Sequence, residues 1–496
     1  PARPSDPGAI LRPPPLSLAG DAANGTAFGG DAAEEARVAR TAPLFFSKPA
    51  SEFRAAMPLG NGRLGAMVYG GAWRETVKLS EESIIAGPRS SMVEVATAMR
   101  ERAGAARQMD AAMAAGEVRA AERAAMTLPY GKVHSYEFLG DISVELAPAS
   151  CASGADGGAE AGGLRCPKQP TFSYRRELDL ETALASVNFQ AAQCAFSRRT
   201  LVSAADDMFA MRINASCAFD VIITLARKDE KRTDGSAHVA EIEGGVGRAR
   251  QALRLHGSSS SNGVSFAAVL ALTAIEPAQA VARSDAGSIV VHGARDLSLT
   301  LSVTTDFEQR LSARSPLSAD ELVTRCADTL AAAATAAPSW SQIVERHVHS
   351  HASRFGAFSL RLGRLSGRRP EAGFRSDLPT DERLRASRSA TREDYGLVEQ
   401  AVQLGRYLLL ASSGPPATLP ANLQGVWAEG ARPPWGSDYH LNINLQQMYW
   451  QAGPLAISDC ISPLAPFLER LAASGAHAAR HLYGSRADGA WMAHGF

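Results

Sequence analysis

The chain has 496 residues, which is more than one ordinary domain holds, so two or three domains are expected. Its 51 Lys and Arg residues balance its 51 Asp and Glu residues, and a net charge of zero lacks the electrostatic footprint of a protein that binds nucleic acid or an anionic membrane. Its most apolar stretch, residues 265–274, is too short to cross a bilayer. We therefore expect no nucleic-acid partner and no membrane partner.

The first half of the chain has the periodicity of β-strands. Residues 1–42 are rich in Pro, Ala, Gly and Asp without periodicity, which predicts a disordered leader. Within residues 43–310, apolar and polar residues alternate from Leu297 to Thr304 and from Asp141 to Leu146. Strands with one buried face therefore dominate, and we predict an N-terminal β-sandwich domain over 43–310, interrupted by an Ala-rich helical segment at 93–126.

The second half changes to the periodicity of helices. Residues 311–392 are predicted to be a helical linker and connector. Residues 393–496 carry an apolar period of 3.6, with one helix behind Asp394 as its N-cap and a second helix that begins at Pro463. Strands followed by helices predict a multidomain β + α protein with separate domains rather than a doubly wound sheet.

The cysteines and the glycosylation sequons indicate in which cellular compartment the protein could be found. Six cysteines occur without a CxxC pair, which disfavours a zinc ribbon or a thioredoxin-type site. Cys151 and Cys166 flank a loop rich in Gly and Ala and could form a disulfide, with unpaired thiols in a reducing compartment as the alternative. Asn24 and Asn214 begin Asn-X-Ser/Thr sequons, which favour a secreted or extracellular protein. Because the sequence begins with Pro1, a signal peptide would lie outside it.

Two motifs match binding signatures but lack their context. Gly60-Asn61-Gly62-Arg63-Leu64-Gly65 satisfies GxGxxG, yet it leads into a strand-like run, so tight β-turns are expected instead of a dinucleotide site. His347, His349 and His351 would share one face only on a strand, whereas the local pattern is helical. A solvated or capping role is therefore expected for these histidines. The sequence indicates no metal site and no cofactor.

Aromatic and amide side chains are densest in three segments, 419–427, 432–435 and 440–445. Trp427 and Trp435 offer faces that stack on the apolar side of a pyranose. The Asn, Gln and His side chains can satisfy sugar hydroxyls that would otherwise be buried without a partner. These segments predict a carbohydrate site.

Polar and apolar residues alternate strictly in the last of these segments. An extended backbone would point His440, Asn442 and Asn444 to one side and bury the three apolar residues that alternate with them. A helix could not do so, because residues two apart lie on opposite sides of it. An Asn-rich loop that caps the next helix is the alternative.

Seven segments, taken together, resemble a known family. They are 58–67, 79–82, 174–180, 378–384, 405–409, 419–427 and 440–450. In this order they resemble glycoside hydrolase family 95, the inverting α-L-fucosidases that cleave α-1,2-linked fucose. The resemblance covers most of residues 43–496 and implies a β-domain, a helical linker and an (α/α)6-barrel catalytic domain. It also implies a fucosylated oligosaccharide or polysaccharide as the partner.

The resemblance implies roles for individual residues. Asn442 and Asn444 match the paired amides that hold the attacking water, an arrangement that relies on orientation because an amide is a very weak base. His440 matches a histidine that contacts fucose, whereas members with Thr at that position tend to prefer L-galactose. Trp491 and His494 resemble a substrate-facing stretch.

The chain also departs from the family pattern. The family's general-acid Glu and its polarising Asp lie further along the barrel than Phe496, and no acidic residue near the motif matches them. We therefore expect a partial (α/α)6 barrel, a truncated or fragmentary chain and little hydrolysis by these residues alone. The alternatives are a non-catalytic remnant that binds fucosylated glycans, an α-L-galactosidase and a glycoside phosphorylase.

Overall fold

The computed structural model describes residues 41–86, 104–127, 134–149, 171–191, 193–227, 238–241, 251–259, 263–277, 279–285, 287–312, 314–362, 377–388, 394–483 and 489. Thr41–Phe496 clusters as one unit and Pro1–Arg40 as another. The predicted leader up to residue 40 lies outside the described residues. The same holds for Cys151, Cys166, Trp491 and His494.

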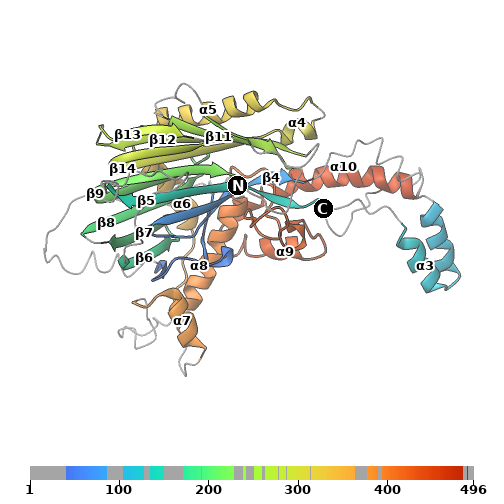
Figure 1. Cartoon of the computed structure of the whole chain (residues 1–496). Helices are drawn as coiled ribbons and strands as arrows, with labels where there is room; N and C mark the ends of the chain where they lie inside the picture. Colours follow the sequence, from blue (N-terminus) through green and yellow to red (C-terminus); the bar gives the residue numbers. More distant parts are fainter. Residues whose placement is uncertain are drawn as a thin grey trace, which may run out of the picture. The chain divides into compact units, whose positions relative to one another are not determined.

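The β-domain is a single hydrogen-bonded sheet in which fourteen described strands pair antiparallel (Figure 1). The strands are β1 (Leu44–Phe46), β2 (Met57–Gly60), β3 (Leu64–Val68), β4 (Arg74–Ile85), β5 (Tyr136–Pro148), β6 (Thr171–Asp179), β7 (Leu184–Ala191), β8 (Cys194–Ser203), β9 (Met208–Ala226), β10 (His238–Glu241), β11 (Gln251–Ser258), β12 (Ser265–Glu276), β13 (Val281–Asp285) and β14 (Ser288–Thr305).

The long strand β9 joins the two layers of this domain. One of its edges pairs with β14. On its other edge, residues 208–215 pair with β8 and residues 219–226 pair with β5. The sheet therefore branches at β9, and side chains from both branches, such as Leu79 of β4 and Val187 of β7, fill one core. The predicted β-domain is confirmed, with the difference that its layers share strands instead of forming two separate sheets.

Burial along the strands follows the predicted alternation only where one face meets solvent. In β5, Ile142, Val144 and Leu146 are buried while the polar residues between them are half-buried. In β14, both Leu299 and Ser302 are buried. The second face of β14 is covered because helix α5 (Ala319–Ala336) packs on it and on β12.

Helices follow the β-domain, as predicted. They are α4 (Phe307–Leu311), α5, α6 (Trp340–Phe355), α7 (Thr380–Ser387), α8 (Tyr395–Ser413), α9 (Asn444–Tyr449) and α10 (Leu464–Tyr483). Short 3-10 turns lie at Phe53–Ala55, Pro434–Ser437 and Ser458–Ile461. None of the helices in the described ranges is long and apolar enough to span a membrane.

Polar caps fix where the longer helices begin. Ser318 and Ser339 form capping boxes with the residues three positions later, which satisfies the first free N–H groups of α5 and α6. The Asp394 side chain accepts a hydrogen bond from Leu397 N at 3.2 Å, so the predicted cap of α8 is confirmed. Helix α10 begins at Leu464, one residue after the predicted start.

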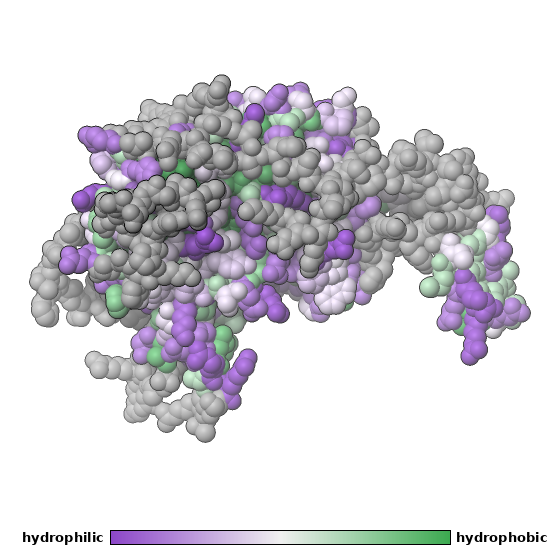
Figure 2. All heavy atoms as spheres, viewed as in Figure 1, coloured by the Kyte–Doolittle hydropathy of each residue, from purple (hydrophilic) through white to green (hydrophobic). Residues whose placement is uncertain are grey.

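The predicted helical interruption of the β-domain is also present. Residues 104–114 are helical and α3 spans Val118–Ala125. Charged and apolar residues both reach the surface here (Figure 2), and Met113, Val118 and Met126 are exposed. The residues from 93 to 103, where the interruption was predicted to begin, lie outside the described part of the chain.

A disulfide that the sequence did not single out joins β8 to β9. Cys194 and Cys217 are bonded, with their Cα atoms 5.6 Å apart. Cys326 and Cys460 are buried free thiols. Disulfides persist in oxidising compartments, so this bond favours the secretory alternative over a reducing one.

Two of the three clustered histidines are part of the packing between α6 and the β-domain. His347 is 3% exposed, and its Nε2 lies 3.3 Å from the carbonyl oxygen of Ala183. His351 Nε2 lies 2.8 Å from the carbonyl oxygen of Leu180. Burial lowers the pKa of His347 to about 4 and that of His351 to about 3. The predicted solvated role is therefore wrong for these two residues, because their helix packs on the turn before β7.

This burial predicts that the stabilising contribution of His347 is sensitive to acid. An unfolded histidine binds a proton near pH 6.5, whereas folded His347 does so only near pH 4, so the unfolded state binds more protons between these values. The contribution of His347 to the free energy of unfolding should therefore fall by about 3 kcal/mol as the pH is lowered from 6.5 to 4. In thermal unfolding measured against pH, we expect His347→Gln to lose the part of the dependence that His347 contributes and to keep the part that His351 contributes. His349→Gln, which changes an exposed residue of the same helix, should retain both parts.

Candidate active site

Hydrogen bonds join the first predicted sugar-binding segment, 419–427, to residues 437 and 438, which lie between the second and the third segment. Asn422 is buried, and its Oδ1 accepts hydrogen bonds from Gln424 N and from Ser437 Oγ, both at 2.8 Å. Leu423 N donates to the carbonyl oxygen of Asp438 at 3.2 Å. The segment 419–427 is thus held against the turn that leads to His440.

The segment 440–445 is a turn that runs into a helix, so the predicted extended backbone is wrong. Residues 441–443 form the turn and Asn444 is the first residue of α9. Leu445 N donates to the carbonyl oxygen of His440 at 3.1 Å, which is a local bond of a helix start rather than of a strand. The alternation is broken because Ile443 is 40% exposed. The structure lies closer to the alternative of a loop before a helix, although the N-cap residue is Ile443 and it makes no side-chain cap.

This backbone brings the three predicted polar residues to the start of α9. Asn442 is exposed in the turn, Asn444 is half-buried at the first helical position, and His440 is half-buried two residues before the turn's midpoint. His440 Nε2 lies 2.9 Å from Oδ1 of Asp438, a carboxylate that is only 9% exposed. A buried carboxylate beside an imidazole can fix the ring's orientation and its proton position.

The two predicted stacking residues differ in exposure. Trp427 is 7% exposed, and its indole N–H donates to the carbonyl oxygen of Leu59 in β2 at 2.8 Å. Its ring therefore packs against the β-domain, which leaves Trp427 a structural role. Trp435 is 77% exposed and Trp450, at the end of α9, is 64% exposed. Trp450 belongs to the family-like segment, but no local pattern distinguished it as a site residue.

The glycines of the GxGxxG motif let the β2–β3 hairpin approach the end of α8. Gly62 N donates to the carbonyl oxygen of Ala411 at 2.8 Å, and its φ is +101°. A Cβ at Gly62 would lie 1.8 Å from the carbonyl oxygen of Gly414, and one at Gly60 would lie 2.2 Å from that of Ala411. The expectation of tight β-turns is confirmed, because the glycines serve backbone contact between the domain and the helix.

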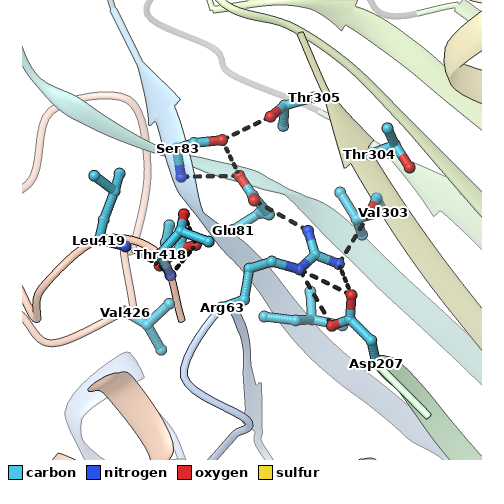
Figure 3. A network of polar contacts seen from close by, with 12 residues as sticks. Arg63, Glu81, Ser83, Asp207, Val303, Thr304, Thr305, Thr418, Leu419 and Val426 are labelled. Carbon is cyan, nitrogen blue, oxygen red and sulfur yellow. Dashed lines mark hydrogen bonds and ion pairs between the residues drawn. The ribbon is translucent and has the colours of Figure 1, made fainter. Parts of the chain in front are cut away.

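Arg63 of the same motif is the centre of a buried network (Figure 3). Its guanidinium lies 3.1 Å from Glu81 and 2.9 Å from Asp207, and it donates to the carbonyl oxygen of Val303 at 3.0 Å. Burial alone would lower the pKa of Arg63, but the charges of Asp207 and Glu81 outweigh it and raise the pKa above its ordinary value. Arg63 thereby ties the β2–β3 hairpin to β4, to β14 and to the turn before β9.

Glu82, the next residue of β4, holds the start of the 419–427 segment. Its carboxylate accepts hydrogen bonds from Thr418 Oγ1 at 2.8 Å, from Thr418 N at 3.0 Å and from Leu419 N at 2.9 Å. Burial, and then the charge of Glu81, raise the pKa of Glu82 to about 7 despite these bonds. Sequence reasoning gave Glu82 no role. The available signal was two successive acidic residues within an otherwise strand-like run, Leu79–Ile85.

Comparisons with known proteins agree with this architecture. Residues 44–310 match the N-terminal domain of glycosyl hydrolase family 65, and residues 339–496 match the glycosyl hydrolase family 95 catalytic domain. A solved structure of a putative kojibiose phosphorylase from human microbiome shares the fold, with a TM-score of 0.51 at 9% identity over 89% of this chain and 51% of that one.

Two curated relatives match most of the chain. Alpha-L-fucosidase 2 of Arabidopsis thaliana is 28% identical over 92% of this chain and 52% of its own length. The probable alpha-fucosidase A of Aspergillus niger is 27% identical over 88% of this chain and 51% of its own length. The chain thus spans about half the length of these relatives. The two family matches thus divide the chain into a β-domain of the family 65 N-terminal type and a following region of the family 95 catalytic type. Residues 339–496 therefore resemble the family 95 catalytic domain, in agreement with the resemblance that the sequence motifs indicated.

The close approach of the β2–β3 hairpin to α8 predicts a large effect of a single methyl group. Gly62→Ala should lower the free energy of unfolding by at least about 3 kcal/mol, because the Cβ meets backbone and the residue has a positive φ. Gly116→Ala is the matched control, since Gly116 also has a positive φ but open space around it, and should cost about 1 kcal/mol. Denaturant unfolding of both variants measures the difference; equal losses would contradict the packing argument.

The raised pKa of Glu82 predicts that its contribution to the free energy of unfolding changes with pH in the opposite direction to that of His347. An unfolded Glu loses its proton near pH 4.5 and Glu82 only near pH 7, so the folded state binds more protons in this window. The contribution of Glu82 is present below pH 4.5 and lost as the pH rises to 7, by about 3 kcal/mol. Thermal unfolding of Glu82→Gln against pH should lack this decline. The exposed Glu345→Gln on α6 should keep it.

Proposed function

We propose that the protein hydrolyses terminal α-L-fucose, joined by an α-1,2 linkage, from oligosaccharides or polysaccharides with inversion at the anomeric carbon. The observation that carries the proposal is the family 95 catalytic-domain match over residues 339–496, which contains the turn with His440, Asn442 and Asn444. Support comes from the α-L-fucosidase names of the curated relatives.

Inverting hydrolysis requires an acid on the leaving oxygen and a water activated on the opposite face of the sugar. In this proposal the amide oxygens of Asn442 and Asn444 hold that water at the start of α9. Because amides are very weak bases, the rate depends on how well they orient the water and on a carboxylate that polarises it. The proposal assigns the general acid to none of the described residues.

His440 is proposed to contact the fucose, with Asp438 as its positioning residue. The 2.9 Å separation of His440 Nε2 from the Asp438 carboxylate supports a fixed imidazole. Trp435 is proposed as the stacking surface, since its indole is largely exposed. The buried Trp427 instead anchors the segment 419–427 to the β-domain. Trp491 and His494 remain proposed substrate contacts.

An extracellular location is part of the proposal. The Cys194–Cys217 disulfide supports an oxidising compartment. A glycan-degrading enzyme outside the cell meets neutral carbohydrate, which agrees with the chain's zero net charge.

The test is release of fucose from an α-1,2-fucosylated oligosaccharide by the protein as its native source produces it, with the first-formed anomer followed by NMR. We expect the β-anomer first, and we expect Asn442→Ala and Asn444→Ala each to lower the rate by at least about 100-fold. Gln447→Ala removes an exposed amide from the same helix and should leave the rate unchanged. Retained activity in both Asn variants would refute the paired-amide mechanism.

The same assay separates the alternative functions. Binding of the oligosaccharide without release would indicate a glycan-binding protein. Phosphate-dependent formation of fucose 1-phosphate would indicate a phosphorylase. A preference for L-galactosides over fucosides in the parent protein would indicate an α-L-galactosidase, and His440→Thr tests which side chain sets that preference.

A further inference from the structure

One of the two sequons lies on a part of the β-domain that the structure describes. Asn214-Ala215-Ser216 is in the middle of β9. Asn214 and Ser216 are both exposed, while Ile213 beside them is 1% exposed, as expected for alternation along a strand. Ser216 Oγ accepts a hydrogen bond from Ala195 N at 2.9 Å.

The outer face of β9 is covered at its start and exposed at the sequon. Met208 and Ala210 are buried in a cluster that includes Leu322 of α5. The cover ends near Arg212, which forms an ion pair with Asp296 at 2.7 Å. A bulky group on the Asn214 side chain would therefore project away from the helices that pack on this face.

A shallow groove of about 460 Å³ adjoins Asn214. The strand register places Asn188, Ser197 and Asn214 side by side across β7, β8 and β9. Ser173, Gln190 and Ser216 complete its polar lining, and none of the described residues that line it is charged. Amide and hydroxyl groups without net charge are suited to hydrogen-bond a neutral N-acetylhexosamine.

The disulfide adds an independent observation about the compartment. Cys217 follows the sequon directly and is bonded to Cys194, so β9 folds where thiols are oxidised. In eukaryotic cells the oxidising compartment in which disulfides form, the lumen of the endoplasmic reticulum, is also where Asn-X-Ser/Thr sequons receive glycans. The sequence alone left both a reducing and an oxidising compartment open.

We propose that Asn214 carries an N-linked glycan whose first sugar lies over the groove between β7 and β9. The donor would be an oligosaccharide joined to a lipid through a diphosphate. The Asn214 Nδ2 forms a bond to the anomeric carbon of the first N-acetylglucosamine, the bond from that carbon to the diphosphate breaks, and the amide proton leaves with the lipid diphosphate. This proposal rests on the sequon and the compartment and is independent of fucosidase activity.

The test uses the protein purified from its native source. Trypsin cleaves after Arg212 and Arg227, so residues 213–227 form one reduced peptide with a single sequon. We expect this peptide to carry hexosamine-containing mass. When an amidase releases the glycan in heavy-oxygen water, the side chain of Asn214 should be converted to an aspartate that contains the heavy oxygen. Recovery of the peptide only in its unmodified form, with the Cys194–Cys217 bond present, would overturn the proposal.

Variants secreted from a eukaryotic host locate the modification. Asn214→Gln and Ser216→Ala should each abolish the mass increase on the 213–227 peptide. Ser216→Thr keeps both the sequon and the hydroxyl that accepts from Ala195 N, and should retain the glycan. Asn24→Gln alters the other sequon and should leave the peptide unchanged. Glycan on the peptide of the Ser216→Ala variant would contradict sequon-directed attachment.

Discussion

The structure depends on the buried polar contact between β4 and the segment that carries the catalytic family motif. Glu81 and Glu82 are successive residues of a strand, so their side chains point to opposite faces. Glu81 pairs with Arg63 inside the β-domain, and Glu82 accepts hydrogen bonds from both Thr418 and Leu419. A buried carboxylate is costly unless such partners satisfy it, so losing either set of partners leaves a charge without compensation.

The β-domain therefore has a direct part in shaping the candidate active site. Trp427 donates to β2, and Tyr136 of β5 donates to the carbonyl oxygen of Val426 at 2.7 Å. Asn422 then joins this anchored segment to the turn before His440. A chain of fixed loops thus runs from the sheet to α9, which accounts for the place of the N-terminal domain in a protein whose catalytic match begins only at residue 339.

Local sequence patterns predicted the elements well where local forces decide them. The switch from period two to period 3.6 predicted the β-domain and the helices, and the side chain of Asp394 predicted the start of α8. Patterns failed where tertiary packing overrode them. His347 is buried because α6 lies on the turn before β7, and Ser302 is buried because α5 covers β14. In both cases the residues that bury the side chain belong to another part of the chain, so the local sequence pattern does not contain them.

The sequence by itself determined the fold class, the family resemblance and the residue types of the candidate site, since these follow from periodicity and from motifs that are contiguous in the chain. Only the tertiary structure decided that 440–445 enters a helix, that Trp427 faces the sheet and that Glu82 holds the motif segment. It also decided that Cys194 is bonded to Cys217. The physical reason is that burial and hydrogen-bond partners come from residues far away in the chain, and a one-dimensional pattern does not contain their distances.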